Sequence, residues 1–333
     1  MARPTWSEAV AEYLAHCEAR GLSAATLRCR ASSLRRFQAI TGDVVVWTVT
    51  AKHVDKVFQH HNWTAATRNQ KLTHFKVFFR WCRARGFMHR DSDPLFGWRM
   101  ETLPKPDRLR IPQNEWWKIF AACQHPNETM ACALGFYLFI RSSEMRAIRL
   151  RDIDLDEGEI LIYRSKTRDY DIMPITKELD GYLRQHLTWL AKQGATNPEH
   201  FLLATRSKPL SFQGAKGFRV GTTRLIPDMA IAYPYKVIQE VLKRAGYPTL
   251  KEGAHTLRRS GARAYFDVLV DSGYDGALKR VQSMLGHSHA QMTEHYLGLD
   301  LDRRNRNKAL KGQPMFPNLE QQDAQIIPIR KGL

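Results

Sequence analysis

A short segment rich in proline and basic residues divides this sequence and limits what the parts on either side can fold into. It covers residues 104–112, which contain three prolines and three Lys or Arg residues. Proline holds the backbone out of helical geometry, and the charges keep the segment in contact with water. We therefore expect a linker over residues 103–112, which joins a domain at residues 1–102 to a second domain at residues 113–310, followed by a tail at residues 311–333.

The net charge of +18 favours a polyanionic partner. Residues 1–100 hold 16 Lys or Arg against 7 Asp or Glu, so they supply half of this excess from less than a third of the length. The first domain is therefore predicted to grip nucleic acid, and double-stranded DNA is the expected partner.

Composition also disfavours a membrane location and a bound metal. The longest apolar run, residues 130–140, is too short to cross a bilayer, which takes about 20 residues. No apolar signal segment is visible near the N-terminus, so we expect a cytoplasmic protein with no membrane partner. The five cysteines are scattered and form no Cys-x-x-Cys pair, which indicates reduced thiols rather than a zinc site or a disulfide framework.

Helix-capping residues predict a helical first domain. Thr5-x-x-Glu8 has the form of a capping box, and similar signals recur along the domain. Four helices are expected, at residues 5–20, 23–40, 50–60 and 64–85.

The last of these helices carries a basic face. Lys76, Arg80 and Arg83 are spaced i, i+4 and i+7, so they project to one side. Such a face is often merely solvated, but the surrounding charge excess favours contact with DNA phosphates. We therefore predict these three residues to bind DNA.

The second domain is predicted to mix helices with a small sheet. Two β-rich runs, at residues 158–163 and 170–175, flank a polar segment and indicate an antiparallel hairpin. Helices are expected at residues 113–123, 128–150, 176–192, 235–244, 255–270 and 277–285, and Ser288-x-x-Gln291 is interpreted as the capping box of one more. The chain as a whole is therefore expected to be mainly α, with a small antiparallel β-sheet and two domains.

Four C-terminal residues have the chemistry that phosphodiester cleavage needs: a nucleophile, a proton donor and cations for the non-bridging oxygens. Arginine suits the last role because it stays charged and can bind phosphate through two hydrogen bonds. His255 and Arg258 lie three apart on one predicted helix and face the same way. His287 follows a glycine helix stop, and Tyr296 lies nine residues later. Each motif is weak alone, since a helical tyrosine is usually a core residue.

Their order and spacing together resemble the tyrosine recombinase (phage integrase) family. The block that carries this resemblance reads His255-Thr256-Leu257-Arg258-Arg259-Ser260, then Leu285-Gly286-His287, then Tyr296. Residues 140–154 resemble the first arginine box of the family, and Ser165-Lys166-Thr167, in the predicted turn, resembles its lysine. Residues 21–37 and 68–85 are similar to the helical core-binding domain. The resemblance covers about residues 5–300.

The resemblance implies a site-specific DNA recombinase that cuts and rejoins strands. Tyr296 would attack the scissile phosphate, leaving a 3′-phosphotyrosyl link and a free 5′-hydroxyl. Arg141 and Arg258 would clamp the non-bridging oxygens, and Lys166 would protonate the 5′-oxygen. The covalent link conserves the bond energy, so no metal, ATP or other cofactor is expected.

Three further residues complete the implied site. His255 would assist proton transfer at the tyrosine, and His287 would add a hydrogen bond to the phosphate. Glu144, three residues after Arg141, would orient that arginine. The resemblance further implies that an N-terminal core-binding domain and a C-terminal α+β catalytic domain form a clamp on DNA.

The sequence departs from the family pattern at two places. Phe139-Ile140 stand where Gly-Leu usually precedes the first arginine, so the turn near Arg141 is expected to be built differently. Arg259 stands where the family usually has histidine. It is expected to serve as a structural residue or as a contact to the DNA backbone, and we count it among the candidate DNA-binding residues.

Other classes of function are less well supported. His287, His289 and His295 could hold a metal, but no carboxylate or thiolate completes a recognisable pattern. A DNA-binding factor that never cuts would not need all six residues of the implied site. A type IB topoisomerase-like enzyme would share the chemistry, but the helical first domain favours recombination. The sequence has no Gly-rich phosphate-binding loop, so an ATP-driven DNA enzyme is disfavoured.

The expected assembly is a synaptic homotetramer with two protomers on each DNA site. We expect the tail, especially residues 326–329, to pack on a neighbouring protomer, with a disordered tail as the alternative. Because the chain begins with the core-binding helices, we expect no additional N-terminal arm-site domain and therefore a simple DNA recombination site. An accessory directionality or host DNA-bending factor is a further candidate partner, and the setting would be a mobile element in a bacterial nucleoid. The target DNA sequence, and the choice between integration and excision, cannot be read from the residues.

Overall fold

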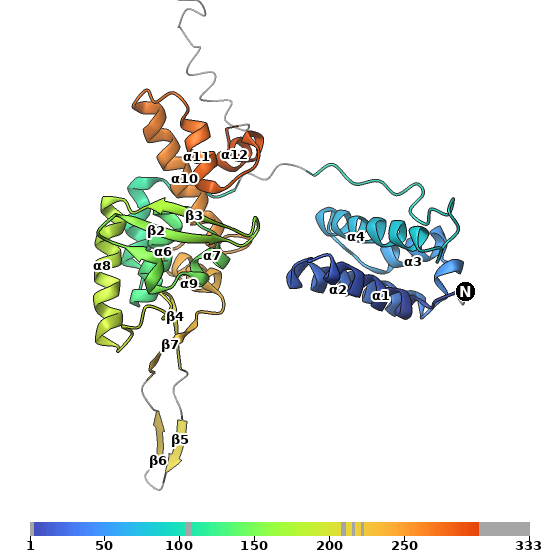
Figure 1. Cartoon of the computed structure of the whole chain (residues 1–333), viewed down its shortest axis with the longest axis horizontal. Coiled ribbons are helices and arrows are strands. Elements are labelled where there is room, and N and C mark those ends of the chain that lie inside the picture. Colours follow the sequence, from blue (N-terminus) through green and yellow to red (C-terminus); the bar gives the residue numbers. More distant parts are fainter. Residues whose placement is uncertain (1–2, 104–107, 208–210, 215–216, 221–222, 300–333) are drawn as a thin grey trace, which may run out of the picture. The chain divides into compact units, whose positions relative to one another are not determined.

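The computed structural model describes residues 3–103, 108–207, 211–214, 217–220 and 223–299. It divides into two compact units, Met1–Pro106 and Asp107–Leu333 (Figure 1). The described residues are mainly helical, with small antiparallel sheets, as predicted. Among them, no helix is both long and apolar enough to cross a membrane. The expected tail, residues 311–333, lies outside the described residues.

The first unit contains the four predicted helices. The capping box of Thr5 is present, and the Ser23 and Thr64 side chains accept N-cap hydrogen bonds from Thr26 and Thr67. The helices are α1 (Trp6–Ala19), α2 (Ala24–Thr41), α3 (Ala51–His60) and α4 (Ala65–Ala84), with a short 3-10 turn, η1 (Val46–Thr48), between α2 and α3.

Stacked aromatic rings form the core of this unit. Trp6 is fully buried and stacks on Phe37 with ring centroids 4.0 Å apart, while its indole nitrogen donates to the Leu34 carbonyl. Phe78 and Phe79 of α4 meet the same indole edge-on. Burial of this side of α4 leaves its opposite side to solvent.

The second unit contains three small sheets and eight α-helices among its described residues. The sheet that matters for the site has the order β1-β2-β3 and is antiparallel throughout. The central helix, α6, packs against α8, α9 and α10 (Figure 1). The elements are η2 (Gln113–Glu115), α5 (Trp116–Ala121), α6 (Pro126–Tyr137), α7 (Ser142–Ala147), η3 (Leu150–Asp152), β1 (Ile153–Asp154), β2 (Glu159–Arg164), β3 (Asp169–Pro174), α8 (Lys177–Lys192), β4 (Ala204–Arg206), β5 (Ser211–Gly214), β6 (Gly217–Val220), β7 (Leu225–Ala230), α9 (Pro234–Arg244), α10 (Ala254–Asp271), α11 (Ala277–Leu285) and α12 (Ala290–Leu297).

The prediction of one helix over residues 128–150 is wrong. The chain forms α6 and α7 there, because Phe139 takes a left-handed conformation with φ 52° that ends the first helix. The Glu144 carboxylate then accepts the backbone N–H of Arg141 at 2.7 Å, which starts the second helix. Apolar residues continue across the break, so their pattern alone does not reveal it.

Two other predictions about local structure also fail. Ser288 does not cap the last helix, since α12 begins at Ala290 and its N-cap is His289, with no side-chain cap. The strand pairs β4–β7 and β5–β6 were not predicted. Short strands of three to six residues, one of which contains Pro227, give little alternation to detect.

Candidate active site

Five segments of the second unit carry the predicted site residues. Arg141 immediately precedes α7, and Lys166 lies in the exposed turn between β2 and β3. His255 and Arg258 lie in the first turns of α10. His287 and Tyr296 complete the set, the former between α11 and α12 and the latter near the end of α12.

Arg258 is a buried cation with donors left open. Its side chain is 1% exposed, and Nη2 donates to the Leu285 carbonyl at 2.6 Å. Within the described part of the chain, Nε and Nη1 have no hydrogen-bond partner. Burial lowers the pKa of Arg258 to about 10, so the group remains charged at neutral pH. A buried guanidinium with open donors is suited to receive an anion.

Glu144 gathers three guanidinium groups around one buried carboxylate. Its oxygens lie 2.7 Å from Arg141 Nη1, 3.2 Å from Arg164 Nη1 and 3.6 Å from Arg258 Nη1. Burial favours a raised pKa, but the hydrogen bonds from Arg141 outweigh it and hold the pKa of Glu144 below its usual value. Asp171, which lies 2.7 Å from Arg164, adds a second negative charge. Two carboxylates against three guanidinium groups leave an excess of one positive charge, which an incoming phosphate can balance.

Tyr296 lies beside this cluster. Its hydroxyl donates to the His255 carbonyl at 3.2 Å, and its ring centroid is 5.8 Å from the Arg258 guanidinium carbon. The His287 ring meets it edge-on at 5.4 Å between centroids. Burial raises the pKa of Tyr296 despite the neighbouring arginines, so the hydroxyl is protonated at neutral pH. It would have to lose this proton in order to act as a nucleophile.

Both site histidines are neutral at pH 7. Burial, followed by the charges of Arg258 and Arg141, lowers the pKa of His287 to about 4. Burial and the same arginines also lower the pKa of His255. The His287 ring is oriented by a 3.1 Å hydrogen bond between Nδ1 and Thr293 Oγ1, and Thr293 is fully buried. A neutral imidazole can accept a proton or donate a hydrogen bond.

The turn before Arg141 is built around Phe139. This residue adopts a left-handed conformation, which costs a residue other than glycine about 1–2 kcal/mol. Its ring is buried in a cluster with Leu285 and Leu297, next to Tyr296. Gly261 of α10 permits this packing, since a Cβ there would lie 2.0 Å from the Phe136 carbonyl oxygen. Packing of α6 on α10 therefore fixes the position of Arg141.

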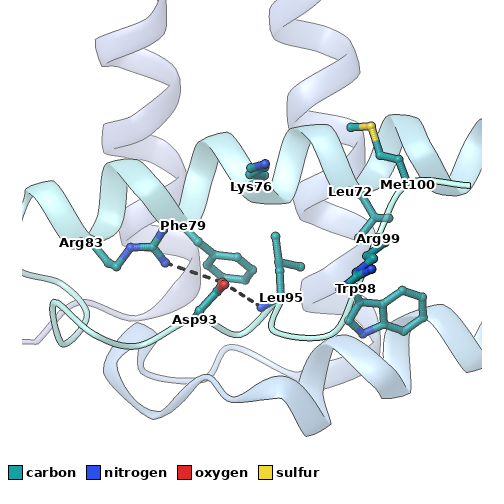
Figure 2. Close-up of a pocket in the computed structure, with 9 residues that line it drawn as sticks. All are labelled: Leu72, Lys76, Phe79, Arg83, Asp93, Leu95, Trp98, Arg99 and Met100. Atoms are coloured by element: carbon teal, nitrogen blue, oxygen red, sulfur yellow. Dashed lines mark hydrogen bonds and ion pairs between the residues drawn. The ribbon is translucent and has the colours of Figure 1, made fainter.

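The candidate DNA-binding residues of α4 differ in their exposure to solvent. Lys76 and Arg80 are exposed on α4, as a phosphate contact requires. The Arg83 side chain is only 26% exposed, and its Nη1 donates to the Ser92 carbonyl. The same nitrogen lies 4.0 Å from Asp93, an ion pair drawn in Figure 2. Lys76 and Arg83 both line a hollow of about 340 Å³, shown in Figure 2.

Arg259 lies in the interior of the second unit, which favours the first of its two expected roles, that of a structural residue. It is 7% exposed, and Nη2 lies 2.7 Å from Glu252 and 2.9 Å from the Leu109 carbonyl. Its hydrogen-bonding groups therefore join α10 to the segment before η2. These contacts support a structural role for Arg259.

Two residues near the site were not predicted. Thr293 orients His287, and nothing in its sequence context marks it out. Arg164 is buried beside Glu144, and a signal existed: it follows Ile160 and Ile162 at a period of two, which places it on the inward face of β2. Among the described residues, no group of three His, Cys, Asp or Glu residues could hold a metal ion.

The comparisons with known proteins agree with this geometry. Residues 110–302 match the sequence profile of the phage integrase family, and this chain belongs to that family, which is also called the tyrosine recombinases. The tyrosine recombinase XerC of Chromobacterium violaceum is 25% identical over 310 residues, which cover 88% of this chain and 90% of that protein. The tyrosine recombinase XerD of Ralstonia nicotianae is 26% identical over 248 residues, which cover 74% and 73%. A match to the protein y4rF of Sinorhizobium fredii, at 24% identity, covers 75% of this chain and 55% of the relative, so the chain spans about half of the latter's length.

Solved structures share the fold. A lambda integrase dimer bound to a COC′ core site has a TM-score of 0.66 and 17% identity, covering 90% of this chain and 78% of that one. The XerH site-specific recombinase, in a post-cleavage complex with a palindromic difH substrate, has a TM-score of 0.60 and 17% identity, covering 87% and 80%. At this identity the likeness concerns the fold alone.

Proposed function

We propose that this protein is a site-specific DNA recombinase that cuts and rejoins DNA through a 3′-phosphotyrosyl intermediate at Tyr296. The observation that carries the proposal is Arg258, a buried guanidinium with open donors, held beside the Tyr296 ring. A phosphate between them would satisfy those donors and meet the nucleophile. Family membership supports the same reaction class.

The proposed first step exchanges one phosphorus–oxygen bond for another. The Tyr296 oxygen attacks phosphorus, the bond to the 5′-oxygen breaks, and no net bond energy is lost. Arg141 and Arg258 stabilise the charge that develops on the non-bridging oxygens. Removing one such contact typically lowers the rate by about 10²–10³.

Protons move at both ends of the reacting phosphate. Neutral His255 assists removal of the Tyr296 proton, and neutral His287 donates a hydrogen bond to a phosphate oxygen. Lys166 supplies a proton to the departing 5′-oxygen. Residues of this chain fill every role, so the reaction as proposed uses no metal and no ATP.

The proposed assembly is a clamp of the two domains on duplex DNA, and four protomers in the synaptic complex. The boundaries at residues 1–102, 103–112 and 113–310 remain part of this proposal. Lys76 and Arg80 are the proposed phosphate contacts of the first domain. A lambda integrase tetramer bound to a Holliday junction, which shares the fold at a TM-score of 0.66, makes a tetramer reasonable. We place the protein's action in the bacterial nucleoid, with or without an accessory DNA-bending factor.

The tail is proposed to stabilise the tetramer through residues 326–329. Deleting the residues after Gln313 is expected to weaken synapsis, which a native gel with two DNA sites would show. Unchanged tetramer formation would contradict this role.

Strand exchange tests the overall function. The duplex site would first be selected from random DNA by binding to the Tyr296→Phe variant, which should bind but not cut. A labelled and an unlabelled copy of that site would then be incubated with wild-type protein, EDTA and no nucleotide. Recombinant products are expected under these conditions. Products that require magnesium or ATP would contradict the proposal.

A further inference from the structure

Arg164 is the most heavily bonded side chain next to the site, and the mechanism above gives it no role. It is the last residue of β2 and is 4% exposed. Its Nη1 lies 3.2 Å from Glu144, and its Nη2 donates to the Met284 carbonyl at 2.9 Å, one residue before the carbonyl that Arg258 binds. One guanidinium therefore touches both the Arg141–Glu144 pair and the end of α11.

The same guanidinium is held from the hairpin by Asp171 of β3. The Asp171 Oδ2 accepts from Nε at 3.0 Å and from Nη2 at 2.7 Å. Asp171 is opposite Ile162 in the antiparallel register, so these two side chains lie on the same face of the sheet. Arg164 follows Ile162 by two residues and lies on that inward face as well. The Asp171 side chain is 38% exposed, so it lies at the rim of the sheet rather than in the core.

The main chain of Arg164 closes the turn that carries Lys166. Its carbonyl accepts the backbone N–H groups of Thr167 at 3.1 Å and Arg168 at 2.8 Å. Lys166 lies inside this loop, two residues from the anchored guanidinium. Ser165 adds a 3.3 Å contact between its hydroxyl and that of Ser143 in α7.

We propose that Arg164 and Asp171 form a positioning pair that holds the Lys166 turn against the Arg141–Glu144 pair. The side chain of Arg164 fixes the position of the end of β2, and its carbonyl fixes the conformation of the turn that follows. Neither residue reacts; each acts through Lys166. The inference rests on the proposed function, in which Lys166 protonates the 5′-oxygen.

Loss of this pair should weaken leaving-group protonation without removing the nucleophile. General acid catalysis typically contributes about 10²–10⁴ in rate, and a catalytic group misplaced by about 1 Å loses much of its effect. A DNA substrate with sulfur in place of the scissile 5′-oxygen removes the need for the acid. A thiol has a pKa near 8.5, so the thiolate departs without protonation.

The experiment compares cleavage of the ordinary and the 5′-sulfur substrate by Asp171→Ala. We expect cleavage of the ordinary substrate to slow about tenfold, and cleavage of the sulfur substrate to stay within about threefold of wild type. Arg164→Lys keeps the charge but not the forked geometry of the guanidinium. Its slow cleavage should be rescued only in part by the sulfur substrate, because the substitution also disturbs Glu144. Asp156→Ala, an equal charge change in the exposed turn before β2, serves as the matched control and should cleave both substrates normally.

Two reference variants separate failure of this inference from failure of the proposed function. Lys166→Ala should be slow on the ordinary substrate and rescued by sulfur, and Tyr296→Phe should be inactive on both. If wild type forms no adduct, or Lys166→Ala shows no rescue, the proposed function itself is at fault. If those references behave as expected, but Asp171→Ala is either unaffected or equally slow on both substrates, the positioning pair is refuted.

Discussion

The Glu144 carboxylate shows how one buried residue can gather a cluster of cations. It holds Arg141 directly and approaches Arg164 and Arg258. Even with Asp171, which pairs with Arg164, only two carboxylates face these three guanidinium groups. Burial lowers the pKa of His287, and the charges of Arg258 and Arg141 lower it further. The same two arginines oppose the effect of burial on the pKa of Tyr296. An anion bound at such a cluster would reduce the repulsion among its positive charges.

One buried histidine, His186, and one half-buried histidine, His287, should make stability depend on pH. The pKa values of His186 and His287 are both lowered to about 4, chiefly by burial, against about 6.5 when unfolded. Between these values the unfolded state binds more protons, so stability is full above pH 6.5 and falls as the pH drops toward 4. The slope should approach about 1.4 kcal/mol per pH unit for each histidine. Urea denaturation at several pH values measures it.

The His287→Asn variant provides the comparison for that measurement. Its slope between pH 6.5 and 4 should be shallower than that of wild type, because one of the two protons is no longer taken up on unfolding. An identical slope in both proteins would show that His287 does not contribute.

At the scale of elements, the close approach of α6 and α10 aligns the two arginines. Arg141 follows the end of α6, and Arg258 lies in α10. Gly261 lies at one of the tightest contacts between them, because a Cβ there would lie 2.0 Å from the Phe136 carbonyl oxygen. Backbone cannot move aside as a flexible side chain can, so the spacing of the two helices is sensitive to a single methyl group.

Gly261→Ala should therefore destabilise the protein by about 3 kcal/mol or more and reduce DNA cleavage, because the helices are forced apart. Gly181→Ala is the matched control. Gly181 lies within α8 and its Cβ would meet nothing within 4 Å, so alanine should stabilise by about 0.5–1 kcal/mol. Thermal or urea unfolding of both variants measures this difference. A Gly261→Ala protein as stable as wild type would contradict the account of this contact.

Sequence patterns predicted elements well where capping residues mark their ends. Thr5, Ser23 and Thr64 begin helices as expected, and the hairpin around Lys166 is present. The patterns failed where tertiary packing overrides local preference, as at Phe139, whose left-handed conformation depends on its contact with α10. The candidate site residues came from family resemblance. The period of two in β2 could have placed Arg164 on the inward face, but its contacts with Glu144 and Met284 depend on distant chain segments. The contact of Arg259 with Leu109 depends on a distant segment in the same way.

At the scale of the whole molecule, the charge of +18 predicts salt-dependent binding to DNA. Each phosphate contact that is lost should reduce the slope of log K against log salt by about 1. Lys76→Ala and Arg80→Ala should each do so, because both side chains are exposed. Arg83→Ala should change the slope less, because its guanidinium is partly committed to Ser92 and Asp93. Fluorescence anisotropy over a salt series measures these slopes, and equal effects of all three would contradict the distinction.

The most direct measurement of the central claim is covalent trapping on a nicked suicide substrate. Such a substrate loses its short 5′-hydroxyl fragment after cleavage, so the protein stays attached to the 3′-phosphate. The account predicts an adduct for wild type, mapped by mass spectrometry to the peptide that contains Tyr296, and no adduct for Tyr296→Phe. An adduct that survives the substitution, or that maps to another residue, would contradict it.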